Sequence, residues 1–92
     1  MSTPESTGND AFAKAAKEIN DLTKKPNNTE LLQLYSLFKQ GIFGDNTTAQ
    51  PGMFDLSGKA KWNAWNEKKG KSKADAQAEY IALVEELKAK YA

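Results

Sequence analysis

Apolar residues recur at intervals of three or four along most of this 92-residue chain, the interval that places side chains on one face of an α-helix. The first stripe follows Asn9 and Asp10, either of which can cap a helix, and Pro26 prevents it from continuing far. The last stripe follows Ser72, which opens a variant capping box, S-K-A-D. The two stripes are Phe12, Ala16, Ile19 and Leu22 near the start, and Ala76, Tyr80, Leu83, Val84, Leu87 and Tyr91 at the end.

Two further helices are predicted in the middle of the chain. One begins at the asparagine pair 27–28, which supplies the N-cap, and ends near Gly44. Its apolar stripe is Leu31, Leu34, Tyr35, Phe38 and Ile42. The other begins after Asp55 or Ser57 and stops before Gly70, a residue suited to the left-handed conformation that follows a helix.

The segment between these two helices, GDNTTAQPGMFDLS, has no periodicity and contains the turn pair Pro51-Gly52, so we predict a long loop. We expect its apolar residues Met53, Phe54 and Leu56 to pin it to the core. Four helices without an alternating strand pattern predict an all-α fold, a four-helix bundle. The long loop would allow helices two and three to run parallel.

Residues 10–92 are expected to form one domain, because a chain this short has no room for a second core. The opening segment MSTPESTGND has neither the basic nor the apolar region of a secretory signal, so we expect no such signal there. Its polar composition predicts a disordered tail over residues 1–9. No apolar run approaches the roughly 20 residues that span a bilayer. With cysteine absent as well, the composition fits a cytoplasmic location.

Composition also disfavours several classes of function. The chain has no histidine and no cysteine, so it lacks the commonest general base and the commonest metal ligands, and no catalytic residues or metal site are predicted. All 13 basic residues are lysines, which bind phosphate as point charges without the bidentate fork of arginine. A net charge of +1 is too small for broad attraction to nucleic acid.

Two pairs of residues at helical spacing could form a binding site. Tyr35 and Lys39 are four apart and could offer a hydroxyl and a charge to one phosphate, or the lysine stem could simply lie over a half-buried ring. Trp62 and Trp65 are three apart; a small domain would use them as core, and a single-strand nucleic-acid platform is the alternative. Lys61, next to Trp62, is the lysine of its cluster placed nearest an aromatic surface.

Several motifs in fixed order closely resemble the acyl-CoA-binding protein family. They are the tyrosine before Lys-Gln in LYSLFKQ, the PGM turn, the GKAKWNAWN run and the closing segment GKSKADAQAEYIALVEELKAKY. The resemblance covers about residues 10–92 and implies an up-down-down-up four-helix bundle. It also implies a cytosolic monomer that binds and carries long-chain fatty acyl-CoA, needs no cofactor and catalyses no reaction. Transient contact with acyl-CoA-using enzymes or with membranes would fit that role.

The resemblance further implies which residues touch the ligand. Tyr35, Lys39 and Lys61 would hold the 3′-phosphate of coenzyme A. Residues near the adenine would be Ala16, Lys25, Phe38 and Tyr80, and the acyl chain would lie on Leu31 and Leu32. The two tryptophans would be mainly structural.

The chain departs from the family pattern at four positions. Phe38 stands where tyrosine is common, and Asn20 and Ser57 stand where basic residues are frequent, so accessory contacts to the ligand differ here. Gly41 replaces a frequent alanine and should weaken its helix by about 1 kcal/mol. The competing interpretation of the whole chain is a helical protein-interaction module, which would have no use for Tyr35, Lys39 and Lys61 together.

Overall fold

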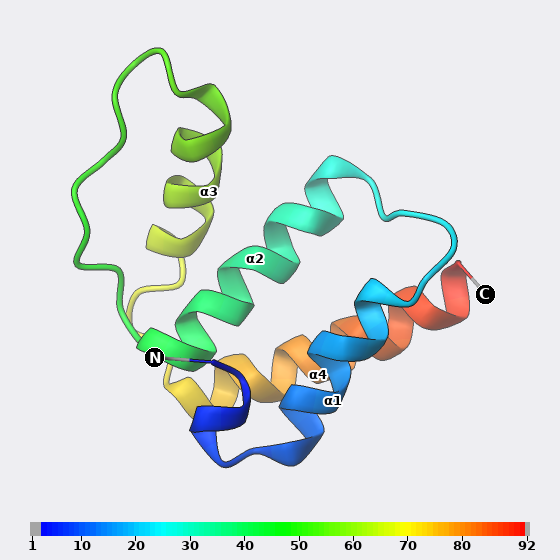
Figure 1. The fold of residues 1–92 in the computed structure, drawn as a ribbon. Helices are drawn as coiled ribbons and strands as arrows, with labels where there is room; N and C mark the ends of the chain where they lie inside the picture. The colour runs from blue at the N-terminus through cyan, green and yellow to red at the C-terminus, as the bar shows by residue number, and fades with distance from the viewer. Residues whose placement is uncertain (1–2, 92) are drawn as a thin grey trace.

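The computed structural model describes residues 3–91, which form four α-helices preceded by a short 3-10 turn (Figure 1). The elements are η1 Glu5–Thr7, α1 Asp10–Asn20, α2 Asn28–Phe43, α3 Leu56–Asn66 and α4 Lys73–Lys90. The described residues contain no strand, so the all-α prediction is confirmed. Within the same residues no helix combines the length and apolar character needed to cross a membrane.

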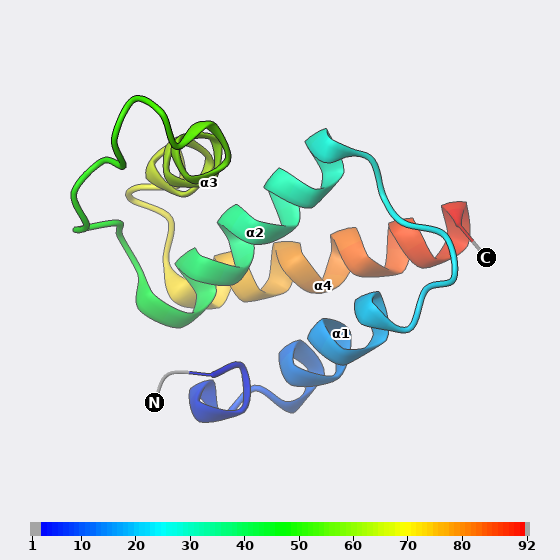
Figure 2. The ribbon, with the colours of Figure 1, turned by 45° about the horizontal axis from the view of Figure 1, so that its top comes forward.

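The helices follow the up-down-down-up order expected of the family. In Figures 1 and 2, α1 and α4 run in one direction and α2 runs in the other. Helix α3 descends in the same general direction as α2 in Figure 1 and is seen nearly end-on in Figure 2, so the two helices are inclined to each other. Helix α4 packs against both α1 and α2, while α3 packs against α2 and, in the described part of the chain, against no other helix. The long connection between α2 and α3 allows these two helices to run parallel.

The polar residues that start the helices act as predicted caps. The side chains of Asn9, Asn27, Asp55 and Ser72 each accept a hydrogen bond from a backbone N–H three residues later, at 2.9–3.1 Å. Asn27 and Glu30 form a complete capping box that the sequence analysis did not anticipate. Two helices are shorter than their stripes indicated: α1 ends at Asn20, and residues 67–70 after α3 form turns.

Three aromatic rings from three helices meet at the centre of the core. Phe12 of α1 lies 5.1 Å from Tyr80 of α4 in an edge-to-face arrangement, and Phe38 of α2 lies 5.8 Å from each of them, measured between ring centroids. Phe12 has 0% of its surface exposed. Around this trio pack Ala15, Leu34, Leu37, Ile42, Val84 and Leu87. The cluster therefore fixes α1, α2 and α4 relative to one another.

Gly41 of α2 packs closely against Gln77 of α4 and the Phe12 ring. A Cβ atom at this position would stand 3.1 Å from Cγ of Gln77 and 3.2 Å from Cζ of Phe12, tighter than ordinary van der Waals contact. The Gln77 amide donates to the Gly41 carbonyl at 2.8 Å and accepts from Asn9 at 2.9 Å. A larger side chain at position 41 would crowd Gln77 and Phe12. This close packing gives glycine a place here, although glycine weakens the helix as predicted from the sequence.

Hydrogen bonds, and not apolar anchors, hold the loop between α2 and α3. The amide of buried Gln40 donates to Asp45 at 3.0 Å and to the Lys71 carbonyl at 2.7 Å, and the Gly70 N–H donates to Asp45 at 2.9 Å. These contacts join the two connections that flank α3. The Gly70 N–H and the Gln40 amide also lower the pKa of Asp45.

The expectation that Met53, Phe54 and Leu56 pin this loop to the core is wrong. Their exposed fractions are 70%, 95% and 76%, and we call these three residues the apolar tip. The physical reason is that the polar contacts near residues 45–48 already secure the loop. The chain beyond them projects outward before α3 begins (Figure 1).

The N-terminal segment contains local structure within its described residues. The turn η1 contacts α1 and α2, and Gly8, at φ +77°, closes it. Disorder over residues 1–9, and the domain boundary at residue 10, stay predictions. Residues 1–2 lie outside the described part.

The C-terminal end of α4 is fastened to the start of α2 through Glu30. Its carboxylate accepts hydrogen bonds from the Lys90 ammonium at 2.7 Å, the Tyr91 hydroxyl at 2.5 Å and the Asn27 N–H at 2.9 Å. These three donors, Lys90 first, lower the pKa of Glu30 to about 2. The capping box and the C-terminal clamp therefore share one carboxylate.

Phe12→Ala should lower the free energy of unfolding by about 3–5 kcal/mol, because it removes the ring that α2 and α4 both contact and leaves a cavity. Urea unfolding followed by circular dichroism measures the change. Lys14→Ala, an exposed position on the same helix, should stay within about 0.5 kcal/mol of the parent protein. A loss below about 1 kcal/mol for Phe12→Ala would contradict the central role of the cluster.

The Glu30 clamp should make stability depend on pH in acid. The folded pKa of about 2 lies below the ordinary value of 4.5, so the contribution is complete above pH 4.5 and is lost as pH falls toward 2. Glu30→Gln should flatten this part of the curve of unfolding free energy against pH, measured by urea titration. Glu86→Gln, on the exposed face of α4, should keep the parental slope. If Glu30→Gln left the dependence of unfolding free energy on pH unchanged between pH 4.5 and 2, the Glu30 clamp would not be its cause.

Candidate functional site

Adjoining cavities follow one side of α2 and share residues with one another. One, of about 380 Å³, lies between the end of α1, the α1–α2 connection and α2, and the next, about 460 Å³, lies between the starts of α2 and α3. A third, about 480 Å³, adjoins α1, and a fourth, about 320 Å³, lies beneath the long loop. Tyr35 lines three of the four cavities, which makes it the centre of the groove.

The α1 end of the groove has an aromatic floor. Phe38 and Tyr80, two members of the central ring cluster, line both cavities at this end, and Ala16 lines the one beside α1. Burial raises the pKa of Tyr80 to about 12, so its phenol stays neutral at physiological pH. The sequence-predicted residues Ala16, Phe38 and Tyr80 therefore lie together; Ala16 and Phe38 are partly exposed, and buried Tyr80 lies behind Phe38 with 3% of its surface exposed.

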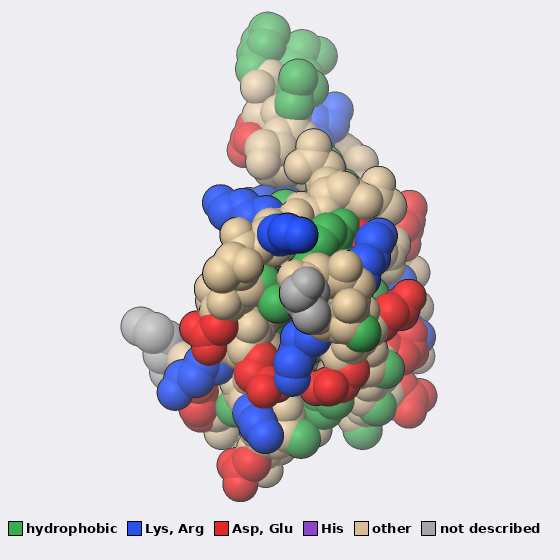
Figure 3. All heavy atoms as spheres, turned by 90° about the vertical axis from the view of Figure 1, so that its right-hand side faces the viewer, with side chains coloured by type: hydrophobic (Ala, Val, Ile, Leu, Met, Phe, Trp, Pro, Cys, Tyr) green, Lys and Arg blue, Asp and Glu red, His purple; other side chains and the backbone are tan. Residues whose placement is uncertain are grey.

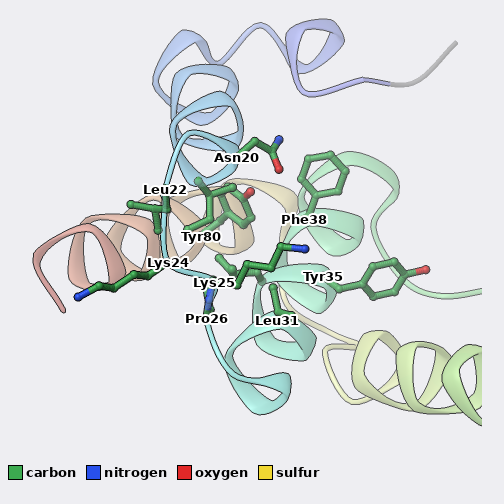
Figure 4. Close-up of a pocket in the computed structure, with 11 residues that line it drawn as sticks. Asn20, Leu22, Lys24, Lys25, Pro26, Leu31, Tyr35, Phe38 and Tyr80 are labelled. Carbon is green, nitrogen blue, oxygen red and sulfur yellow. The ribbon is translucent and has the colours of Figure 1, made fainter. Parts of the chain in front are cut away.

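Lys25 joins this end of the groove from the α1–α2 connection. Figure 4 shows its side chain reaching across the cavity toward Phe38, whereas the neighbouring Lys24 points away. Asn20 lines the same two cavities as Phe38, and its amide donates to the Ala16 carbonyl at 3.1 Å. A neutral amide thus stands where the family often has a positive charge.

Two lysines from different helices converge on Tyr35. The Lys39 ammonium lies 5.7 Å and the Lys61 ammonium 5.6 Å from the centroid of the Tyr35 ring, and all three line the cavity beneath the long loop. Neither ammonium forms an ion pair with any residue in the range 3–91, whereas Lys71, Lys88 and Lys90 all do. Two ammonium groups that contact aromatic rings but form no ion pair among the described residues are an arrangement suited to a phosphate.

The packing of α3 on α2 brings Lys61 to this position. Trp65 is buried, its ring lies 6.0 Å from Phe43, and its indole N–H donates to the Gly44 carbonyl at 2.9 Å. The Trp62 indole donates to the Thr48 carbonyl at 3.0 Å. Trp65 therefore fastens α3 to the end of α2, as the expected core role implies, whereas half-buried Trp62 fastens α3 to the long loop.

The cavity between the starts of α2 and α3 has a mainly apolar lining. Leu31 and Leu32, predicted from the resemblance, line it together with Leu56 and Ala60. Sequence reasoning placed Leu56 in the core and did not single out Ala60, although the alanine directly precedes Lys61 in the GKAKW motif. Ser57, one of the departures from the family pattern, also borders this cavity.

Comparison with known proteins agrees with this geometry. The sequence model of the family described as acyl CoA binding protein matches residues 9–84. The chain belongs to the acyl-CoA-binding protein family. It is 64% identical over 81 residues to acyl-CoA-binding protein homolog 1 of Caenorhabditis elegans and 60% identical over 81 residues to the homolog of Drosophila melanogaster. In both alignments the match covers 88% of this chain and 94% of the relative.

Solved structures of family members share the fold. The crystal structure of Oryza sativa Acyl-CoA-Binding Protein 2 superposes with a TM-score of 0.84 at 38% identity, covering 88% of this chain and 90% of that chain. The solution structure of the yeast acyl coenzyme A binding protein gives 0.71 at 51% identity, covering 87% and 93%. The family and fold predicted from the motifs are thereby confirmed.

The family names describe binding and name no reaction. Among the described residues, no group of three or more histidine, cysteine, aspartate or glutamate side chains could hold a metal ion. The groove itself combines an aromatic floor, an apolar cavity and the ammonium groups of Lys39 and Lys61, which form no ion pair within the described residues. Chemically, this arrangement can hold a ligand that carries a flat ring, a phosphate and a hydrocarbon chain.

Proposed function

We propose that this family member binds long-chain fatty acyl-CoA in the groove along α2 and carries it through the cytoplasm as a monomer, without catalysing a reaction. The observation that carries the proposal is the convergence of Lys39 and Lys61 on Tyr35, between an aromatic and an apolar cavity and with no carboxylate partner among residues 3–91. The names of its relatives support acyl-CoA as the ligand.

The 3′-phosphate of coenzyme A would accept hydrogen bonds from Tyr35, Lys39 and Lys61. A hydrogen bond to a charged group contributes about 1.5–3 kcal/mol, so three donors can orient the head group and select for this phosphate. The phosphate would also be an ion-pair partner for the two ammonium groups, which have none among the described residues.

The adenine would lie on the floor made by Phe38 and Tyr80, beside Ala16. Phe38 keeps the ring contact but lacks the phenolic hydroxyl common in the family, so its contribution is stacking alone. Lys25 points into the same region and would contact the charged part of the ligand near the base. Asn20 could contribute a hydrogen bond but no charge.

The acyl chain would run along Leu31 and Leu32 toward Leu56 and Ala60. Burial contributes about 0.8 kcal/mol for each methylene, so a palmitoyl chain could gain on the order of 10 kcal/mol before ordering costs. Preference for acyl-CoA over free coenzyme A should therefore come mainly from the chain. Such a carrier needs only to shield the thioester and the chain from water and then release the ligand.

Titration calorimetry with three ligands tests the proposal. Palmitoyl-CoA should bind most tightly, the 3′-dephospho ester about tenfold or more weaker, and free coenzyme A weaker still, because each comparison removes one group of contacts. Equal heats and affinities for all three ligands, or no binding of palmitoyl-CoA, would refute it. Single-stranded nucleic acid should give no salt-sensitive binding.

Substitutions locate the phosphate site. Lys39→Ala, Lys61→Ala and Tyr35→Phe should each weaken palmitoyl-CoA binding by about tenfold or more, because each removes one donor to the phosphate. Lys59→Ala is the matched control, since Lys59 lies on the same helix as Lys61 but lines none of these cavities. All variants should stay folded by circular dichroism. If Lys59→Ala lost as much affinity as Lys61→Ala, general charge and not a built site would explain binding.

A further inference from the structure

The apolar tip has no function in the groove beyond the one wall that Leu56 forms. Met53 and Phe54 line none of the four groove cavities, and Phe54 is 95% exposed. Figure 3 shows hydrophobic side chains gathered at the projecting top of the molecule, where Figure 1 places the end of the long loop and the start of α3. Large apolar side chains exposed together mark a surface that is covered by something else.

The turn that carries the tip is held by hydrogen bonds on either side of Met53 and Phe54. The Asp55 N–H donates to the Gly52 carbonyl at 3.0 Å, and Pro51 has no N–H to satisfy. The Asp55 carboxylate accepts from the Gly58 N–H at 2.9 Å, so it is turned back into the helix cap. These bonds fix the turn that presents the Met53 and Phe54 side chains to solvent.

The sequence around the tip carries more lysines than carboxylates. Asp55 is the one acidic residue from Asn46 to Asn66, and of the two lysines that follow within two turns, Lys59 lines no groove cavity whereas Lys61 lines two. A convex tip of three side chains does not offer the roughly 800 Å² that each partner contributes to a standard protein interface. Apolar residues flanked by lysines do match the boundary between the headgroups and acyl chains of an anionic bilayer.

The tip is also continuous with the apolar end of the groove. Leu56 belongs to both, because it lines the cavity that holds Leu31 and Leu32. A bilayer in contact with Met53 and Phe54 would therefore lie next to the mouth of that cavity. This continuity connects the tip with a ligand whose hydrocarbon chain itself partitions into membranes.

We propose that the apolar tip is a membrane-docking element that inserts Met53 and Phe54 into an anionic phospholipid surface and holds the apolar end of the groove against it. The inference rests on the proposed function, since it gives the acyl chain a short path between bilayer and groove. Lys59, which lines none of the groove cavities, would keep the start of α3 at the headgroup level while the tip enters.

Vesicle sedimentation with ligand-free protein tests the docking element. The probes are vesicles of phosphatidylcholine alone and of phosphatidylcholine mixed with phosphatidylserine. The parent protein should bind the mixed vesicles more strongly, and replacing both tip residues by serine, M53S with F54S, should weaken binding about tenfold or more. The matched variant with M53L and F54L should retain binding, because it keeps the apolar surface.

Calorimetry with palmitoyl-CoA in lipid-free solution separates this inference from the proposed function. The serine variant should keep the parental affinity there, since neither changed residue lines the groove. The inference is overturned if the parent protein binds neither vesicle, or if the serine variant binds vesicles as well as the parent does. It is also overturned if analytical ultracentrifugation shows a parental dimer that the serine variant abolishes, because a second copy would then cover the tip. A parent protein that binds vesicles but not palmitoyl-CoA would refute the proposed function alone.

Discussion

The contact on which the rest of the structure depends is the meeting of Phe12, Phe38 and Tyr80. One ring comes from each of α1, α2 and α4, so the cluster sets the relative positions of three helices that are far apart in sequence. Phe12 is enclosed, while the other two rings also form the floor of the groove. The same aromatic cluster therefore belongs to the core and to the groove. A change that loosens the core would also disturb the α1 end of the groove, where we propose that the adenine lies.

Polar contacts have a different task, which is to position the segments that the core does not reach. Gln40 and Asp45 join the two connections around α3, and Glu30 joins the ends of α2 and α4. The indole N–H groups of Trp62 and Trp65 do the same for the long loop. The loop could leave its apolar residues in solvent because these hydrogen bonds already secured it.

Sequence reasoning predicted the parts of the fold that local chemistry determines. Periodicity located the four helices, and asparagine, aspartate and serine marked their starts because capping depends on a few adjacent residues. The exposure of Met53 and Phe54 could not be predicted, since a loop has no period that assigns a side chain to a face. Spacing alone paired Tyr35 with Lys39, whereas Lys61 needed the tertiary packing of α3, which only the family motifs indicated.

The attachment of α3 to α2 alone has a consequence for local unfolding. Because α3 contacts neither α1 nor α4 within the described residues, it can detach without opening the aromatic core. Its detachment would separate Lys61 from Tyr35 and Lys39, so the site would be complete only while α3 is packed on α2. A ligand held from both helices would add a second attachment between α3 and the rest of the fold, and its binding energy would appear as protection of α3 against exchange and proteolysis.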